Sequence, residues 1–298
     1  DLFGEMGHAS LISGGALQET IDALLGAIGM EASKSHVDGH WQIEFPIPDA
    51  DLPDCEVTRN IEARHTNRLP FTSISARDLN ALQDLVDSNQ QVRVLTDRIV
   101  IREVGRAVRL CSEARFNSQS LHEWLFSSIR WTAAEANLGD GLDVETLHLP
   151  PGAKHFMKFI SPWRRMSALN RLGIYKLLAL VDSQPVTSAP ILIGIVGPAT
   201  TSGAWNAGRL MQRLWIRLNA MHLAVHPYYV VTDLTGRLPS LVAPNSGGKS
   251  VEIADRIARH AFQLNSESKL HMLLRIGRPI RDPVRSKRKA AEVFLPSN

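Results

Sequence analysis

Two clusters of basic residues in the sequence are suited to binding an anion. Residues 64–68 read RHTNR and combine two arginines, a histidine and a threonine hydroxyl. Arginine presents a rigid fork of donors that matches a phosphate, and a hydroxyl and backbone amides can add hydrogen bonds. The second cluster, RSKRK, occupies residues 285–289. Each cluster alone is most often a solvated charged surface, but together with the order of elements between them they favour an anion-binding role.

The string APNSGGKS at residues 243–250 loosely fits a phosphate-binding loop with alanine in place of the first glycine. Such a loop follows a buried strand, opens a helix, and uses backbone amides and a lysine, here Lys249, to hold phosphates. The apolar run SLV before it is too short for a convincing strand, and no hydrophobic strand with a magnesium-binding aspartate follows. We therefore predict a polar loop that begins a helix, without a catalytic role for Lys249.

Other residues that could do chemistry lack the partners they would need. His36 and His40 have the spacing of metal ligands on a helix, but Gly39 intervenes and no third ligand is near, so we predict no metal site. Cys55 and Cys111 belong to no CxxC pair, and the sequence contains no GxSxG motif. The acidic run at residues 49–54 is interpreted as a solvated connection. No catalytic side chain is assigned.

The composition is that of an ordinary globular protein with 298 residues, 44% hydrophobic and 21% charged. Aromatic residues make up only 6% and do not interleave with the basic clusters, so nucleic acid is not a predicted partner. Two cysteines without a disulfide framework favour a reducing cytoplasm. The most apolar helical stretch contains Arg209, Arg213 and Arg217, which predicts a buried helix and no membrane span.

Hydrophobic periodicity predicts a mixture of helices and buried strands. The predicted helices are residues 13–29, 75–86, 97–114, 120–131, 165–181, 204–223 and 251–263. The predicted strands are residues 40–45, 91–97, 189–198, 224–233 and 271–279, with a short extended segment at 141–152. Ser75 and Asp78 are placed to cap the second helix. This mixture predicts a layered α+β or α/β domain, with a boundary near Asp54.

The order of these segments resembles the nitroreductase-like flavoprotein family. RHTNRLPF followed by a helix resembles the family's basic entry motif, and GAWNAGRLMQRLWIRLNAMHLAVHPYYVV resembles its central helix and the strand after it. MLLRIGRP and SKRKAAEVF resemble its last strand and terminal basic segment. The likeness covers about residues 62–294 and depends on the order and spacing of the motifs. It implies an α+β fold in which a central, mostly antiparallel sheet is flanked by helices.

The segments SGGALQETIDALLGAIG, EARFNSQSLHEWLFSSIRW and DGLDVETLHLPP, with RHTNR after the first of them, resemble a subgroup in which two such halves are fused. Examples of this subgroup are the dormancy-associated Acg proteins of mycobacteria and fusions with an E1-like adenylating domain. This likeness implies that residues 1–54 are the C-terminal remnant of a first half and residues 55–298 a second half with the flavin-phosphate motifs. Because the sequence begins without Met, we expect residue 1 to lie inside a longer protein. The implied macromolecular partner is a second copy or the upstream part of the same protein.

The family binds FMN between two halves, and the likeness implies which residues would hold it here. The implied cofactor-binding residues are Arg64, His65, Thr66, Arg68, Pro227, Tyr228, Lys287 and Arg288. The first three would contact the phosphate and the ribityl chain or ring edge, and Arg68 would approach the ring. Lys287 or Arg288 would complete the phosphate clamp. The family's PSxxNxQPW-like stretch, which meets the flavin's pyrimidine edge, has no counterpart in this chain.

The activity implied by the likeness is an FMN-dependent NAD(P)H oxidoreductase that acts on a nitroaromatic, a quinone or a similar small electron acceptor. Tyr228 and Tyr229 stand where the family brings backbone amides to the flavin, and their bulk could narrow access to it. Two alternatives stay open. One is a flavin-binding or flavin-sequestering protein with little turnover, and the other is a non-catalytic interaction domain of a larger adenylating enzyme.

Overall fold

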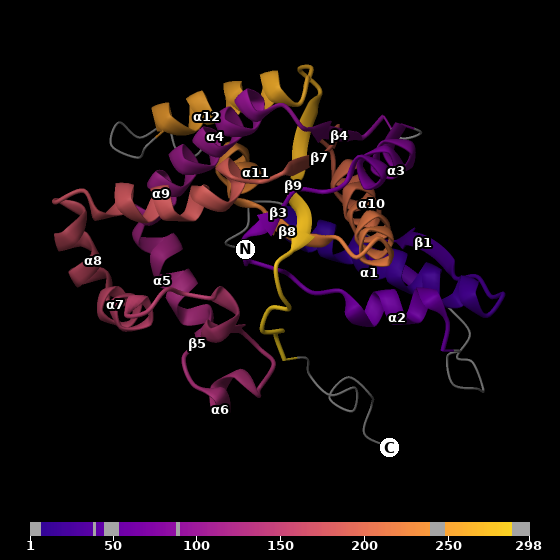
Figure 1. Ribbon diagram of the computed structural model, residues 1–298, viewed down its shortest axis with the longest axis horizontal. Coiled ribbons are helices and arrows are strands. Elements are labelled where there is room, and N and C mark those ends of the chain that lie inside the picture. Colours follow the sequence, from indigo (N-terminus) through magenta and orange to yellow (C-terminus); the bar gives the residue numbers. More distant parts are fainter. Residues whose placement is uncertain (1–6, 38–39, 45–53, 88–89, 239–247, 288–298) are drawn as a thin grey trace.

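The computed structural model describes residues 7–37, 40–44, 54–87, 90–238 and 248–287 (Figure 1). Its centre is a five-stranded antiparallel sheet built around β9 (Ser268–Pro279). One edge of β9 pairs with β7 (Ile191–Pro198), which pairs in turn with β4 (Val92–Leu95). The other edge pairs with β8 (Ala224–Tyr228) and, at its end, with β3 (Phe71–Thr72). The α+β class with a mostly antiparallel sheet flanked by helices is confirmed.

Helices cover both faces of this sheet and form two hydrophobic cores. One core lies under α1 (His8–Ala27), α3 (Ala76–Asp87) and α10 (Thr201–Ala220). The other lies under α4 (Arg98–Phe116), α9 (Ile174–Thr187), α11 (Val230–Gly236) and α12 (Gly248–Ala261), on the opposite side in Figure 1. Ile191, Ile193 and Ile195 enter the first core and Leu192 the second, which explains why β7 is a continuous apolar run.

Smaller elements surround this sandwich. They are the hairpin β1 (Ser33–Val37) and β2 (His40–Glu44), α2 (Glu56–Ala63), α5 (Gln119–Ser128), β5 (Ile129–Arg130), α6 (Ala133–Ala136), β6 (Leu142–Asp143), a 3-10 helix (Val144–Leu147), α7 (Ala153–Ile160) and α8 (Trp163–Asn170). α7, α8 and α9 follow one another along one side of the molecule (Figure 1).

α1 packs along α10 at a distance that only glycine permits. A Cβ added to Gly208 would lie 2.0 Å from the carbonyl oxygen of Ile12, and one added to Gly15 would lie 2.0 Å from that of Trp205. Ion pairs then join the helices, because the nearly buried Glu19 binds Arg209 at 3.1 Å and Arg213 at 2.6 Å. Two of the three arginines that argued against a membrane span, Arg209 and Arg213, thus pair with α1. None of the helices described is long and apolar enough to cross a membrane.

Several helices begin at side chains that accept backbone N–H groups. Asp97 accepts from the amides of Ile99 and Val100 at the start of α4. Ser75 Oγ accepts from the amide of Asp78 at 3.1 Å, as the sequence predicted. These bonds satisfy N–H groups that the first helical turn leaves free. Helix starts were therefore predictable from short motifs.

Four local predictions differ from the structure. The strand predicted at residues 224–233 ends at Tyr228, because Val230, Val231 and Leu234 meet the second core at helical spacing in α11. The segment at 141–152 contains a 3-10 helix rather than being extended. The helix predicted at 165–181 is divided at Gly173, whose φ is 85°. The helix predicted at residues 13–29 begins earlier, at His8. The strand predicted at residues 40–45 is confirmed, and His36 and His40 lie on the β1–β2 hairpin.

The predicted division at residue 54 stays a prediction. Residues 8–27 form α1, and Ile12 of this helix belongs to the same core as β7 and α10. Asp54 forms an exposed ion pair with Arg59 at 2.6 Å, and the part of the acidic run from residue 49 to 53 lies outside the described residues.

The close contact between α1 and α10 predicts opposite effects of two glycine substitutions on the stability of the protein. Replacing Gly208 with Ala places a methyl group against the Ile12 carbonyl, so we expect the free energy of unfolding to fall by about 2–3 kcal/mol. A Cβ on Gly26 of α1 would meet no atom within 4 Å, so Gly26→Ala should raise it by about 0.5–1 kcal/mol. Urea denaturation measures both. Equal effects of the two substitutions would contradict the close packing.

Candidate functional site

The RHTNR segment runs from α2 to β3 and is held against the sheet. The amide of Asn67 donates to the carbonyl of Val225 on β8 at 3.0 Å. The Asn67 side-chain oxygen accepts from the amide of Leu69, also at 3.0 Å. These bonds keep Asn67, which is only 1% exposed, in one conformation beside β8. The segment that the sequence singled out is therefore well ordered and borders the sheet.

The buried Arg275 of β9 holds this segment by hydrogen bonds to its backbone. Arg275 is 2% exposed, and its Nη2 donates to the carbonyls of Asn67 and Leu69 at 3.1 and 2.7 Å. The guanidinium carbon also lies 3.8 Å from the ring centre of Phe71. Burial lowers the pKa of Arg275 to about 10, so it remains a cation at neutral pH. No ion pair between described residues includes Arg275.

The four predicted residues of the segment point to different neighbours. The Arg64 guanidinium lies 4.8 Å from the ring centre of Trp215 on α10. His65 bonds the carbonyl of Ala63 at 2.7 Å, and Thr66 is half-buried. Arg68 approaches the opposite side, where its Nη1 donates to the carbonyl of Thr146 at 3.5 Å. Arg64 and Arg68 therefore flank the segment rather than meeting at one point.

The two predicted residues on β8 lie on opposite faces of the sheet, Tyr228 in the second core and Pro227 beside Leu274 of the first core. Tyr228 is buried, and its hydroxyl donates to the carbonyl of Asp182 on α9 at 3.5 Å. Pro227, which is half-buried, pairs with Leu274 of β9. The neighbouring His226 lies opposite Arg275 in the register of β8 and β9. Burial and the charges of Arg275 and Arg68 lower the pKa of His226 well below its usual value, so this ring is neutral.

The C-terminal segment after β9 returns towards Arg68. The amide of Val284 donates to His148 Nε2 at 3.2 Å. Burial lowers the pKa of His148, and the charges of Arg281 and Arg68 lower it further, so both arginines lie near this ring. Lys287 is exposed on the same segment, and Arg288 lies outside the described residues. Arg281, which the sequence analysis did not select, is the basic residue of this segment whose charge acts on His148 together with that of Arg68.

Buried donors at this site have no partner within the described part of the chain. They are Asn67 Nδ2 and Arg275 Nε, and His226 Nδ1 beside them is also unpaired. A buried polar group without a hydrogen bond is costly, so each calls for an explanation such as a bound ion or ligand. Donors and cations predominate here, and this chemistry suits a phosphate or another anion.

A second polar cluster ties α1 to the far end of β8 and β9. Its members form one chain of hydrogen bonds from Tyr229 Oη to His8 Nδ1 (2.6 Å), from His8 Nε2 to His271 Nδ1 (3.0 Å), and from His271 Nε2 to the Pro198 carbonyl (3.0 Å). The carbonyl only accepts, so His271 carries its proton on Nε2 and accepts from His8. His8 in turn accepts from the Tyr229 hydroxyl. In this assignment each ring carries one proton and is neutral.

The surroundings enforce that neutrality. Burial, with the positive charge of Lys269, lowers the pKa of His8 to about 3 and that of His271 to about 4. Lys269 is itself partly buried, and burial lowers its pKa. The cluster therefore couples the docking of α1 to the protonation state of two histidines.

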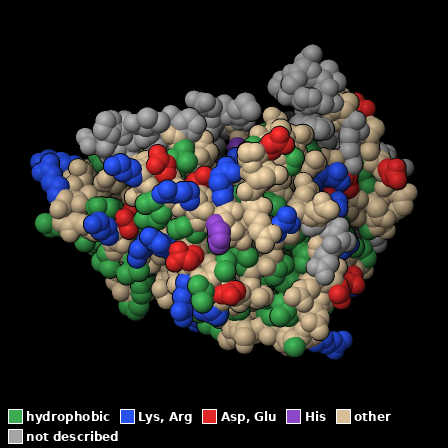
Figure 2. All heavy atoms as spheres, turned by 90° about the horizontal axis from the view of Figure 1, so that it is seen from above, with side chains coloured by type: hydrophobic (Ala, Val, Ile, Leu, Met, Phe, Trp, Pro, Cys, Tyr) green, Lys and Arg blue, Asp and Glu red, His purple; other side chains and the backbone are tan. Residues whose placement is uncertain are grey.

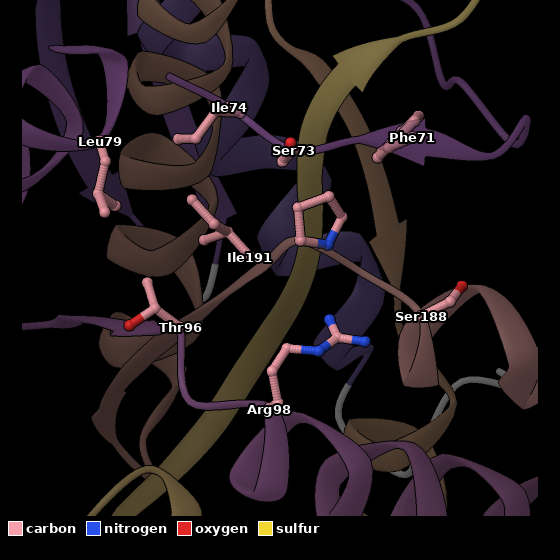
Figure 3. A pocket seen from close by; sticks show the side chains of 9 residues that line it. Phe71, Ser73, Ile74, Leu79, Thr96, Arg98, Ser188 and Ile191 are labelled. Carbon is pink, nitrogen blue, oxygen red and sulfur yellow. The ribbon is translucent and has the colours of Figure 1, made fainter. Parts of the chain in front are cut away.

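A pocket of about 420 Å³ lies beside the buried arginine (Figure 3). Phe71 lines this pocket and stacks on Arg275 as well. Figure 3 shows Ile74, Leu79 and Ile191 at one end and Arg98 reaching into the other. Arg98 donates to the carbonyl of Ala189 at 2.6 Å, so its guanidinium ties α4 to the start of β7. The lining is mostly apolar, and no ligand is assigned to it.

The arrangement of the chain is similar to that of solved flavoproteins. The FMN-dependent nitroreductase NfnB from Mycobacterium smegmatis, in complex with NADPH, matches at 16% identity and a TM-score of 0.45, over 82% of this chain and 98% of its own. A nitroreductase with bound FMN from Bacteroides fragilis matches at 10% identity and 0.40, over 82% and 100%. Iodotyrosine deiodinase bound to FMN and 3-iodo-L-tyrosine matches at 12% and 0.40, over 81% and 99%.

No family model matches the chain, and no curated protein matches its sequence. At these identities and TM-scores the likeness concerns the arrangement of elements, and what the site binds has to follow from the chain's own residues.

The remaining motifs stay outside this site. Lys249 is exposed as the second residue of α12, and residues 243–247 of its motif lie outside the described part of the chain. Among the described residues there is no group of three His, Cys, Asp or Glu side chains that could hold a metal ion. Five residues at the site were missed by the sequence analysis: Asn67, His148, His226, Arg275 and Arg281. Arg275 had a detectable signal, because a charge within the apolar strand HMLLRIG is unusual.

Removing the Arg275 side chain should loosen the RHTNR segment. Arg275→Met leaves the carbonyls of Asn67 and Leu69 without their donor, so we expect the free energy of unfolding to fall by about 2–4 kcal/mol. Hydrogen exchange should become faster at the amides of residues 67–69. The exposed Arg106→Met, on α4, is the control and should change neither quantity. Unaltered exchange in Arg275→Met would show that the segment does not depend on this side chain.

The histidine cluster predicts a loss of stability in acid. Because the folded pKa values of His8 and His271 lie below the value of about 6.5 in the unfolded chain, only the unfolded state takes up protons as the pH falls below about 6.5. Each such proton lowers the free energy of unfolding by about 1.4 kcal/mol per pH unit. His8→Leu should therefore lose less stability than the wild type between about pH 7 and pH 5.

Urea denaturation across this range measures the difference, and the exposed His260→Leu is the control because it should keep the wild-type slope. A His8→Leu slope equal to the wild-type slope would contradict the neutral assignment of the cluster.

Proposed function

We propose that the chain binds FMN and acts as an NAD(P)H-dependent oxidoreductase of the nitroreductase type on a nitroaromatic, a quinone or a similar small acceptor. The observation that carries this proposal is the buried, unpaired cation Arg275 with unsatisfied donors around it. A phosphate or an anionic ring supplies the acceptors that these donors lack. The order of elements resembling the family's motifs supports the choice of FMN over other anions.

The residues of this site suit both the phosphate of FMN and the part of its ring that becomes negative on reduction. Arg64, His65 and Thr66 would meet the phosphate or the ribityl chain, and the C-terminal basic segment, now including Arg281, would approach from the side of Arg68. Arg68 and Arg275 would face the part of the ring that becomes negative on reduction. The free donor of Asn67 is a further candidate hydrogen-bond partner.

FMN, when bound, accepts a hydride from the nicotinamide and passes two electrons to the acceptor. The chain contributes positive charge held in place before the reaction, which stabilises negative charge better than mobile water does. Arg275 is preorganised by its two carbonyl bonds and its stacking on Phe71. Neutral His226 adds no competing charge beside it. No side chain is assigned as an acid or base.

A flavin-sequestering protein with little turnover is the second candidate. It is favoured by Tyr228 and Tyr229, whose hydroxyls are bound to Asp182 and His8, so that neither tyrosine can swing aside without breaking a hydrogen bond. A ring covered at this end of β8 would be poorly accessible to a nicotinamide. The two candidates share the FMN site and differ only in access to it. The third reading, a non-catalytic interaction domain, requires no flavin.

Spectroscopy of the purified chain with added FMN separates these functions. Bound flavin that bleaches when NADPH or NADH is added under anaerobic conditions, and recovers its colour with a quinone, supports the oxidoreductase. Bound flavin that does not bleach supports sequestration, and the absence of binding contradicts both.

Replacing Arg68 tests the proposed site itself. We expect Arg68→Gln to weaken FMN binding by about 10- to 100-fold, because a charge-assisted hydrogen bond contributes about 1.5–3 kcal/mol. Quenching of FMN fluorescence measures the dissociation constant, and Arg106→Gln on the far side of α4 is the control. If Arg68→Gln binds FMN as tightly as the wild type, the RHTNR segment is not the flavin site.

A further inference from the structure

The helical segment that joins the 3-10 helix to β7 is unusual in charge. Residues 146–181 contain six of the chain's 33 Lys and Arg residues and none of its 30 Asp and Glu residues. The six are Lys154, Lys158, Arg164, Arg165, Arg171 and Lys176. The remainder of the chain therefore has an excess of acidic residues. Positive charge is concentrated on α7, α8 and α9.

These charges are largely uncompensated. Lys154 pairs with Glu145, just before the segment, at 2.5 Å. The other five take part in none of the ion pairs that join described residues. Arg165 instead donates to the carbonyl of Phe159 at 3.0 Å and lies 4.9 Å from the centre of the Phe159 ring. The basic groups are thus available to an anionic surface.

The same segment exposes large apolar side chains. Six of the eleven large hydrophobic residues that are exposed in the described structure belong to it: Phe156, Phe159, Leu172, Leu177, Leu180 and Val181. Leu172 is 81% exposed and Val181 61%. On α9 the exposed residues Leu177, Leu180 and Val181 follow helical spacing, and the opposite face buries Ala179 and Val186. α9 therefore presents an apolar stripe to solvent.

Basic and apolar side chains lie together on the surface at this end of the molecule. Figure 2 shows green and blue side chains side by side at its left, the side on which Figure 1 places α8 and α9. Arg171, Leu172, Lys176 and Leu177 succeed one another around the start of α9, and all four are exposed. The carboxylate of α9, Asp182, is paired with Arg115 of α4 at 3.0 Å. Large apolar residues flanked by Lys and Arg are typical of helices that lie in a membrane interface.

We propose that α7, α8 and α9 form a docking surface for an anionic lipid bilayer. The apolar stripe of α9, with Leu172, enters the level of the headgroups, while Arg171 and Lys176 contact lipid phosphates. The helices lie on the surface and do not cross it, since α9 has only 14 residues. None of the described helices could span a bilayer, and a contact at the bilayer surface requires no such helix.

A bilayer fits this surface better than a second copy of the chain does. A symmetric contact between two copies places the same patch on both sides, so the five uncompensated cations of one copy would face those of the other. Like charges at an interface oppose association. A membrane containing anionic lipids supplies apolar depth and negative charge at once. The observed pairing of apolar and basic residues therefore favours lipid.

Vesicle sedimentation of the full 298-residue chain tests this proposal. We expect binding to mixed phosphatidylcholine and phosphatidylglycerol vesicles at low salt, much weaker binding to phosphatidylcholine alone, and release by high salt. Charge reversal in Arg171→Glu with Lys176→Glu should weaken binding by more than about tenfold. Leu177→Ser with Val181→Ser should weaken it by a similar factor through loss of the apolar insertion.

Matched controls are available elsewhere on the surface. Leu138 is 63% exposed on the loop after α6, and Arg77 is exposed on α3, so Leu138→Ser with Arg77→Glu should bind like the wild type. All the substituted side chains are exposed, and thermal unfolding should confirm that each variant folds.

Three outcomes would overturn the proposal. They are no binding to anionic vesicles by the wild type, equal weakening by the control pair, and self-association of the wild type that Leu177→Ser with Val181→Ser abolishes. The last would assign the face to a protein contact. None of these outcomes depends on flavin, so the proposal stands or fails separately from the oxidoreductase function.

Discussion

The buried guanidinium of Arg275 is the interaction on which the candidate site depends. It lies on β9, the strand that pairs with both β7 and β8, and it holds the carbonyls of Asn67 and Leu69. A desolvated cation without a carboxylate is expensive. Here two carbonyl dipoles and the face of Phe71 offset part of that cost, and unsatisfied donors remain. A fold that keeps such a group has its positive charge where an anionic ligand can complete it.

The position of this charge follows from how the two cores are built. β7 and β9 are covered on both faces, so a side chain in the middle of β9 has little access to water and stays where the sheet places it. α1 contributes to the same construction. Its glycine contact with α10 brings His8 to β9, where it binds His271 and Tyr229. The histidine cluster thus lies near the start of β9, and the arginine lies further along the same strand.

The two basic regions of this protein differ in how far their charges are exposed to solvent. Around Arg275 and Arg68, burial strengthens each electrostatic interaction and makes the arrangement of donors decisive. Along α7 to α9 the cations are exposed to solvent and screened by salt, so they act by number and by their combination with apolar side chains. The first kind of site suits one small anion held in a fixed geometry. The second suits an extended, charged and deformable partner.

The sequence by itself determined the elements and part of the site. Apolar periodicity predicted α1, α4, α10, β7 and β9, because each buries a face whose spacing is visible in the chain. RHTNR was recognisable as a candidate because its arginines, histidine and threonine together suit an anion. The strand prediction failed at residues 230–233, where β-branched residues suggested a strand and packing against the second core favours a helix instead.

Only the tertiary structure decided which residues meet. It brought Arg275, His226 and Arg281 to the RHTNR segment from positions at least 158 residues away, measured from Arg68 to His226. It also separated Arg64 from Arg68, which the sequence had treated as one cluster. Proximity between distant segments depends on strand register and helix packing. The local spacing of residues in one sequence predicts neither of these.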